Sequence, residues 1–226
     1  MIVLSLLIIL GQTAACIGLG LLTFRILRLS ENAAYGETVA LSFAVGTGLL
    51  GWLMFFLGIA GLFNATILGA VMALGVGALF VCRDQVRISS IKNIGMVSWA
   101  LLSLCSVIIL FDMIEALSPP GDADSLAYHF ALPKKFIDAG SIIFEPRAID
   151  GAIPLLVQMT YIPPLLLGGE IALTLWTFAS ALGASALLYV LSRRHLDFQW
   201  SLVNVLVFLT VPVVVYAAGS GQVEIR

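Results

Sequence analysis

Charged residues are scarce in this sequence. Of its 226 residues, 11% are Asp, Glu, Lys or Arg and 61% are apolar, whereas soluble domains carry about 25% charged residues. This composition excludes an ordinary soluble globular domain and predicts an integral membrane protein. The 11 basic residues do not outnumber the 13 acidic ones, so the chain lacks a basic surface and we expect no nucleic-acid partner.

Cysteine is also scarce. Cys16, Cys82 and Cys105 are odd in number, lie inside apolar runs and show no paired spacing. These features exclude a disulfide framework and argue against a zinc site built from cysteines. The three thiols are expected to act as small buried apolar groups.

Long apolar runs, by contrast, are frequent. A helix needs about 20 apolar residues to cross a bilayer, and this rule predicts an all-α, polytopic transmembrane bundle of six spans. The predicted spans are residues 2–24, 38–62, 65–82, 96–117, 170–192 and 200–218. Gly46, Gly48, Gly51 and Gly58 are expected to allow close helix packing.

The basic residues predict the orientation of these spans. Most of the lysines and arginines follow spans one, three and five: Arg25, Arg28, Arg83, Arg87, Lys92, Arg193 and Arg194. The positive-inside rule puts these residues in the cytoplasm. The amino terminus and the long loop 118–169 are then expected on the outer side.

The apolar stretch 152–169, AIPLLVQMTYIPPLLLGG, is not expected to be a further span. It is short, and Pro154, Pro163 and Pro164 interrupt it, removing backbone donors that lipid cannot replace. We expect a helix that lies on the outer membrane surface or dips into it.

The polar part of the loop predicts a broken amphipathic helix at this surface. Asp122 or Asp124 is a natural N-cap, Pro133 is expected to interrupt the helix, and Gly140 is expected to end its second piece. At 100° per residue, two opposite faces result. The apolar face carries Leu126, Phe130 and Ile137, and the polar face carries Asp124, Tyr128 and Lys135.

Two further acids, Asp112 and Glu115, end the fourth span three residues apart and share a helix face. Acids within a span usually face a cavity or a partner. They can equally be hydrated where the span meets water. With Asp122 and Asp124, four carboxyl groups surround one outer helix end.

The other polar side chains of the loop allow two interpretations each. Lys134, Lys135 and Arg147 can receive a phosphate group, or the lysines can extend toward lipid head groups. His129 can bind a metal ion or can only be hydrogen-bonded.

Three motifs give the sequence a family resemblance: DADSLAYHFALPKKFIDAG, then GGEIALTLWTFASALGASALLYVLSRR, then a span ending in AGSGQ. From Asp112 to Gln222 the chain resembles the bacterial GT-C membrane glycosyltransferases, which include the protein mannosyltransferases and the lipid A aminoarabinose transferases. The resemblance implies a plasma-membrane enzyme that passes a sugar from a polyprenyl-phosphate carrier to a glycan, lipid or protein acceptor on the outer side.

The resemblance also implies a site. The catalytic acid of the family's first outer loop falls on Asp124, with Asp122 as a second acid and Glu224 as a weaker candidate. Transfer by a single displacement inverts the sugar and needs a base for the acceptor hydroxyl and positive charge for the departing phosphate. The expected substrate-binding residues are Tyr128, His129, Lys134, Lys135, Arg147 and Glu224. Asp122 and Asp124 can also hold Mg²⁺ or Mn²⁺, and segment 152–168 is expected to guide the polyprenyl chain.

Residues 1–95, with three spans, precede the family-like part, so the predicted division is 1–95 and 96–226. Because relatives continue through more spans, this chain is expected to be the amino-terminal part of such an enzyme. Two alternatives stay open. One is a transporter or flippase segment whose polar path includes Asp112 and Glu115, and the other is a scaffold subunit.

Overall fold

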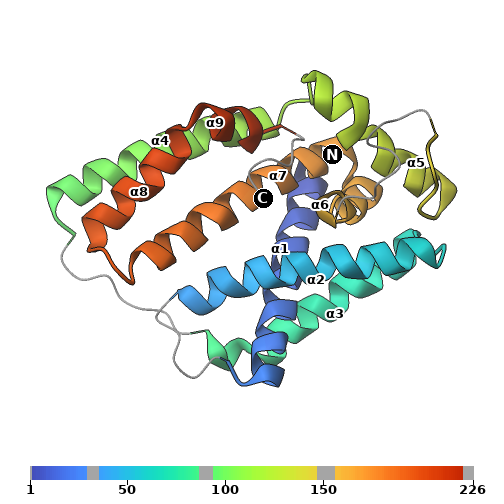
Figure 1. Ribbon diagram of the computed structural model, residues 1–226, viewed down its shortest axis with the longest axis horizontal. Helices are drawn as coiled ribbons and strands as arrows, with labels where there is room; N and C mark the ends of the chain where they lie inside the picture. The colour runs from blue at the N-terminus through green and yellow to red at the C-terminus, as the bar shows by residue number, and fades with distance from the viewer. Residues whose placement is uncertain (1, 30–35, 87–93, 147–155, 221–226) are drawn as a thin grey trace.

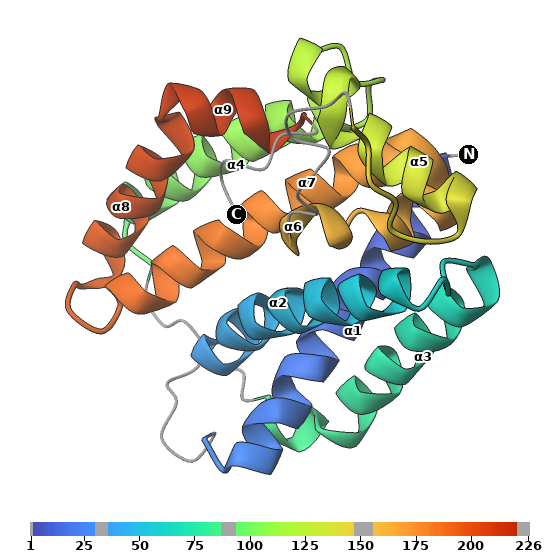
Figure 2. The same cartoon turned by 45° about the vertical axis from the view of Figure 1, so that its right-hand side comes forward.

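The described part of the chain is entirely helical. The structure, a computed structural model, describes residues 2–29, 36–86, 94–146 and 156–220. Figure 1 and Figure 2 show the helices packed as one bundle, with the long helix α7 between α1–α3 on one side and α4, α8 and α9 on the other. The helices are α1 (Ile2–Leu27), α2 (Glu37–Ile59), α3 (Ala65–Val81), α4 (Met96–Ala116), α5 (Ala131–Ala139), α6 (Leu156–Met159), α7 (Ile162–Ser192), α8 (Phe198–Thr210) and α9 (Pro212–Ala218).

Four helices are long and apolar enough to cross a membrane: α1, α2, α4 and α7. The six predicted spans are therefore supported only in part. Helix α3 has the position predicted for the third span but only 17 residues, and the predicted span 200–218 is broken. Helices α8 and α9 meet at an angle of 73°, where Pro212 begins α9. Proline cannot donate the hydrogen bond that would continue α8, and this explains the break.

One end of the bundle carries arginines from several helices. Arg25 at the end of α1 donates a 3.0 Å hydrogen bond to the carbonyl of Val81 at the end of α3. Arg194, just after α7, forms an ion pair with Glu37 at the start of α2. The predicted grouping of basic residues at one end thus holds for these described arginines, whereas Arg87 and Lys92 lie outside the described residues. Which side of a membrane this end faces stays a prediction.

The opposite end carries the loop that follows α4. The backbone amide of Phe63, after α2, donates to the carbonyl of Gly140 at 3.0 Å. The Thr174 hydroxyl in α7 donates to the carbonyl of Ala116, the last residue of α4, at 2.6 Å. The first bond holds the loop against the end of α2, and the second holds α7 against the end of α4.

Small residues let α1, α2 and α3 cross closely. A Cβ at Gly46 of α2 would lie 1.7 Å from the carbonyl oxygen of Cys16 in α1, and one at Gly18 of α1 would lie 2.0 Å from that of Gly75 in α3. No side chain fits at these distances. Gly46 therefore packs as the sequence predicted, whereas a Cβ at Gly48 would meet nothing within 4 Å.

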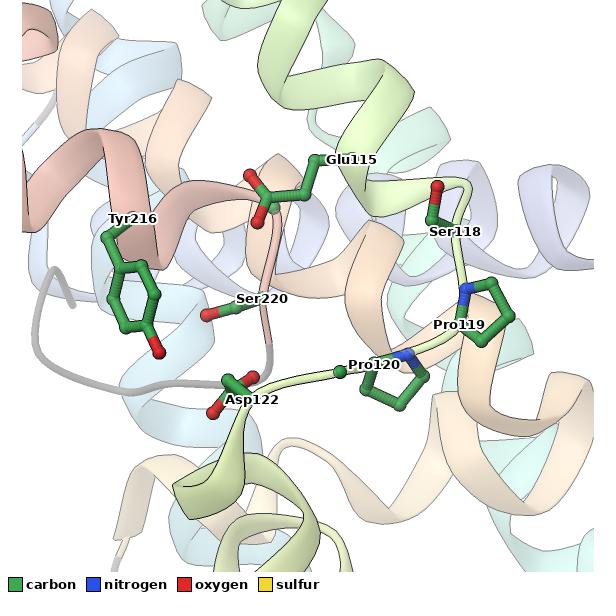
Figure 3. A pocket seen from close by; sticks show the side chains of 9 residues that line it. Glu115, Ser118, Pro119, Pro120, Asp122, Tyr216 and Ser220 are labelled. Carbon is green, nitrogen blue, oxygen red and sulfur yellow. The ribbon is translucent and has the colours of Figure 1, made fainter.

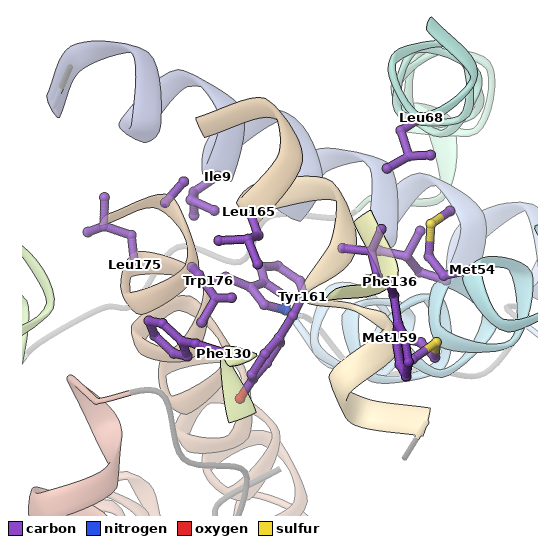
Figure 4. Packing of buried hydrophobic residues seen from close by; sticks show 14 of the residues in the cluster. Ile9, Met54, Leu68, Phe130, Phe136, Met159, Tyr161, Leu165, Leu175 and Trp176 are labelled. Atoms are coloured by element: carbon purple, nitrogen blue, oxygen red, sulfur yellow. The ribbon is translucent and has the colours of Figure 1, made fainter. Parts of the chain in front are cut away.

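The start of α7 is buried in the protein. Tyr161, Ile162 and Leu165 belong to the main apolar cluster with residues of α1 and α2, and the cluster also contains Phe130 and Trp176 (Figure 4). The described residues 156–165 of the segment are thus partly or fully covered by other helices, whereas residues 166–169 are half-buried. Whether this segment lies on or dips into the membrane surface, and whether it guides a polyprenyl chain, stay predictions.

Helix α7 is kinked at Gly169, whose φ of 76° and ψ of −165° are not helical. Its 31 residues would rise about 46 Å as a straight helix, which exceeds the roughly 30 Å of bilayer hydrocarbon. The part after the kink coincides with the predicted span 170–192, and the kink turns the part before it into the core.

Helix α4 exposes most of its apolar surface. It packs against α8 and α7, yet Trp99 is 58% exposed and Phe111 is 67% exposed. A helix with such a surface is stable in lipid, where exposed apolar side chains cost nothing. This exposure supports a membrane location for the bundle.

Candidate functional site

The loop after α4 begins with a turn fixed by Asp122. Its Oδ1 accepts a hydrogen bond from the Ser125 amide at 2.7 Å, and the π-helical turn η3 (Ser125–His129) follows. Asp124 makes no capping hydrogen bond through its side chain. Of the two predicted caps, Asp122 therefore has this role, because only its carboxyl group reaches a free amide at the start of the turn.

Residues of the predicted apolar face differ in exposure. Phe130 is 1% exposed and Leu126 is 52% exposed, and both are compatible with a face that lies on the bundle or on lipid. The π-helical turn adds a residue to its hydrogen-bonded ring, so an angle of 100° per residue does not hold across it.

The break in the helix also differs from the prediction. It comes at Phe130, and Pro133 lies in the first turn of α5, where its missing N–H costs nothing. Gly140 ends α5 with a φ of 68°, as predicted for a glycine C-cap.

His129 is buried at 1% exposure. Its Nδ1 lies 2.9 Å from Nε2 of Gln158 in α6, and its ring contacts that of Tyr128 with centroids 4.1 Å apart. Of the two interpretations, the hydrogen-bonded one matches this geometry. His129 thereby links the loop to the buried segment before α7.

Both predicted phosphate-binding lysines form ion pairs. Lys134 pairs with Glu170, next to the kink in α7, and Lys135 pairs with Glu145 at 2.6 Å. Their side chains are about half exposed, at 46% and 50%. Exposed ion pairs contribute about 0–1 kcal/mol, so an incoming phosphate group can compete for either lysine.

A pocket of about 370 Å³ lies between the end of α4, the start of the loop and the end of α9. Figure 3 shows the carboxyl groups of Glu115 and Asp122 and the hydroxyl of Tyr216 turned toward one space. The residues that line it are Glu115, Ser118, Pro119, Pro120, Gly121, Asp122, Tyr216, Gly219 and Ser220. It therefore offers two carboxyl groups and three hydroxyl groups beside proline and tyrosine rings.

Tyr216 and Ser220 were not expected from the sequence. They lie about 100 residues after Glu115, and only the bend between α8 and α9 turns them toward the end of α4. Pro212 was the one visible signal of this bend, and the apolar run that contains it concealed it.

The structure brings together only some of the predicted site residues. Asp122 and Glu115 share the pocket, Asp112 is buried one turn earlier in α4 at 4% exposure, and Asp124 is exposed outside the pocket lining. Arg147 and Glu224 lie outside the described residues, so their predicted roles stay predictions.

A divalent cation on Asp122 and Asp124 stays a prediction. In the described ranges, no group of three or more His, Cys, Asp or Glu side chains is placed to hold a metal ion. Asp122 and Asp124 are two carboxylates, and that of Asp122 already caps η3.

Comparison of the chain with protein-family models, curated protein sequences and solved structures yields no match.

Proposed function

We propose that this chain is, or forms part of, a membrane glycosyltransferase. It would pass a sugar from a polyprenyl-phosphate carrier to an acceptor at the acid-bearing end of the bundle. The observation that carries the proposal is the pocket in which Glu115 and Asp122 lie beside Tyr216 and Ser220. All four residues belong to the stretch 112–222 that resembles the GT-C enzymes.

The pocket has properties that suit a sugar. Ligand sites have volumes of about 300–1,000 Å³ and combine apolar walls with a few polar groups that fix orientation. Here Pro119, Pro120 and the Tyr216 ring provide the walls, and carboxyl and hydroxyl groups provide the polar contacts. Carboxylates accept strong hydrogen bonds from hydroxyl groups, of which a sugar ring carries several.

The proposed reaction is one displacement at the anomeric carbon. A carboxylate of the pair Asp122 and Asp124 takes the proton of the acceptor hydroxyl, whose oxygen forms the new bond to the sugar. The bond between the sugar and the phosphate oxygen breaks, and the polyprenyl phosphate leaves with the electron pair. Lys134 and Lys135 are the described cations of the loop that can receive this phosphate.

The family resemblance indicates Asp124 as the base. The pocket favours Asp122 instead. Asp122 lines the pocket, whereas Asp124, the residue just before η3, is exposed and outside the pocket lining. Positioned acid–base catalysis contributes about 10²–10⁴ to a rate, so the two assignments differ by a measurable amount.

The transporter alternative receives less support. A polar path across the membrane needs ionisable groups at several depths, yet α1, α3, α8 and α9 contain no Asp or Glu. The acids of α4 are confined to its last two turns. Of these two acids, Glu115 lines the pocket and Asp112 is buried one turn earlier.

The test is transfer of radiolabelled sugar from synthetic polyprenyl-phosphate hexose and pentose to water or to added glycan, lipid and protein acceptors. The complete protein is assayed in proteoliposomes, and transfer is measured as release of the sugar from its carrier. We expect release by the wild type and a loss of about 10²-fold or more in Asp122→Asn. Asp138→Asn, at an exposed position of α5, is the matched control and should retain full activity. If Asp124→Asn alone abolishes release, the base is Asp124.

Absence of release from every donor would contradict the proposed function. If proteoliposomes with the protein instead move the intact lipid-linked sugar between leaflets, and Asp112→Asn stops that movement, the protein is a transporter and not a transferase.

A further inference from the structure

We infer that the pocket between α4 and α9 holds the transferred sugar ring and that it selects against anionic sugars. This inference rests on the proposed function and adds the class of sugar to it. The transferred group would be a neutral or cationic ring, and uronic acids and phosphorylated sugars would be excluded.

The first step is the charge of the pocket lining. Among the described residues that line it, the ionisable side chains at neutral pH are Glu115 and Asp122, and none is a lysine, an arginine or a histidine. Like charges brought together at an interface cost several kcal/mol. A ring that carries its own carboxylate or phosphate therefore meets repulsion, whereas hydroxyl or ammonium groups meet acceptors.

The second step is that the described lysines of the loop lie outside the pocket lining. Lys134 and Lys135 lie on α5 and are held by Glu170 and Glu145, and neither lysine lines the pocket. The phosphate of the donor and its sugar ring therefore need different surroundings. The ring fits the pocket, whose described lining has no cation for the phosphate.

The third step is the size and shape of the pocket. Its volume of about 370 Å³ lies near the lower end of the usual range of about 300–1,000 Å³, which suits one sugar ring better than an oligosaccharide. Tyr216 is 53% exposed, so the ring can enter from the surface. The rings of Pro119 and Pro120 offer it an apolar wall.

The test uses two water-soluble probes that differ only at C6, phenyl β-D-glucopyranoside with a neutral hydroxymethyl group and phenyl β-D-glucuronide with a carboxylate. Their binding to the complete protein in nanodiscs is followed by saturation-transfer NMR. We expect the glucoside to bind and the glucuronide to bind at least about tenfold more weakly, a difference of about 1.4 kcal/mol. Glu115→Gln and Asp122→Asn should each reduce this difference, because each removes one negative charge.

Two variants serve as matched controls. Asp138→Asn on α5 and Glu145→Gln at the Lys135 ion pair remove a negative charge outside the pocket, and both should preserve the preference for the glucoside. Equal binding of the two probes by the wild type would overturn the inference, as would a preference unchanged in both pocket variants.

If neither probe binds, the inference is also overturned, since the pocket would then hold no sugar ring. The release assay with polyprenyl-phosphate sugars would still decide the proposed function. The two failures can therefore be told apart.

Discussion

Gly219 lies directly against Glu115. A Cβ at Gly219 would be 2.7 Å from Cβ and 2.8 Å from Oε2 of Glu115. The end of α9 thus presses on the carboxyl group that α4 contributes to the pocket. Because Cβ of Glu115 is fixed to the helix, rotation of the side chain cannot relieve a contact at this position.

Gly219→Ala should therefore damage the pocket. Overpacking of this kind typically costs about 1–3 kcal/mol, and we expect Glu115 to be displaced and binding of phenyl β-D-glucopyranoside to fall at least about fivefold. Gly121→Ala is the matched control, because Gly121 also lines the pocket but a Cβ there would meet nothing within 4 Å. Equal binding by both variants would contradict the role given to the contact between Gly219 and Glu115.

A buried polar network joins α1, the segment before α7, and α7. Trp176 Nε1 donates to Thr160 Oγ1 at 2.9 Å, and Gln12 Nε2 donates to the Thr160 carbonyl at 3.0 Å. Thr160→Val leaves the buried indole N–H without its acceptor, which should lower the free energy of unfolding by about 1–3 kcal/mol. The measurement is thermal unfolding in detergent.

Thr210→Val is the control for this network. Thr210 is exposed on α8 and bonds only to carbonyls of its own helix among the described residues. Its replacement should change the free energy of unfolding by less than about 0.5 kcal/mol. A loss as large as that of Thr160→Val would show that the hydroxyl of Thr160 has no special role.

The kink of α7 depends on glycine at position 169. Its φ and ψ fall in a region that is almost restricted to glycine and costs other residues about 1–3 kcal/mol. Gly169→Ala should destabilise the protein by about this amount in detergent unfolding, although a Cβ there would meet nothing within 4 Å. Gly77→Ala, in the helical part of α3 with equal space, should be neutral or stabilise by about 0.5–1 kcal/mol.

The predicted membrane orientation can be tested with single thiols. Asp124 and Arg193 are exposed at opposite ends of the bundle, and the three native cysteines are buried. In intact cells, an impermeant maleimide should label Asp124→Cys and spare Arg193→Cys, and lysis should allow labelling of both. Labelling of position 193 alone in intact cells would mean that the orientation is reversed.

Much of the helical architecture could be predicted from the sequence, because length and hydropathy decide where helices cross lipid. The starts of α2, α3 and α4 lie within a residue of the predicted starts of their spans. The differences concern the length of α3 and the bends of α7 and of the pair α8 and α9. The pair Pro163 and Pro164 was taken as a reason for a surface helix, yet proline is tolerated in a helix's first turn. Pro212 was overlooked within an apolar run.

The candidate site was less predictable. Asp122 and Glu115 could be identified because both stand out in an apolar sequence. Their neighbours Tyr216 and Ser220 could not, because the contact depends on how α9 turns after Pro212. The ion pairs of Lys134 and Lys135 were also missed, since they join residues 36 and 10 positions apart and no local pattern indicates them.

The most direct measurement is the location of bound sugar. A polyprenyl-phosphate sugar with a diazirine on the sugar ring would be photolysed with the complete protein in proteoliposomes, and the labelled peptides would be identified by mass spectrometry. We expect labels within residues 115–122 and 212–220, with loss of label in excess unmodified donor. Competed labelling confined to the arginine-bearing end, around residues 193–200, would contradict this expectation.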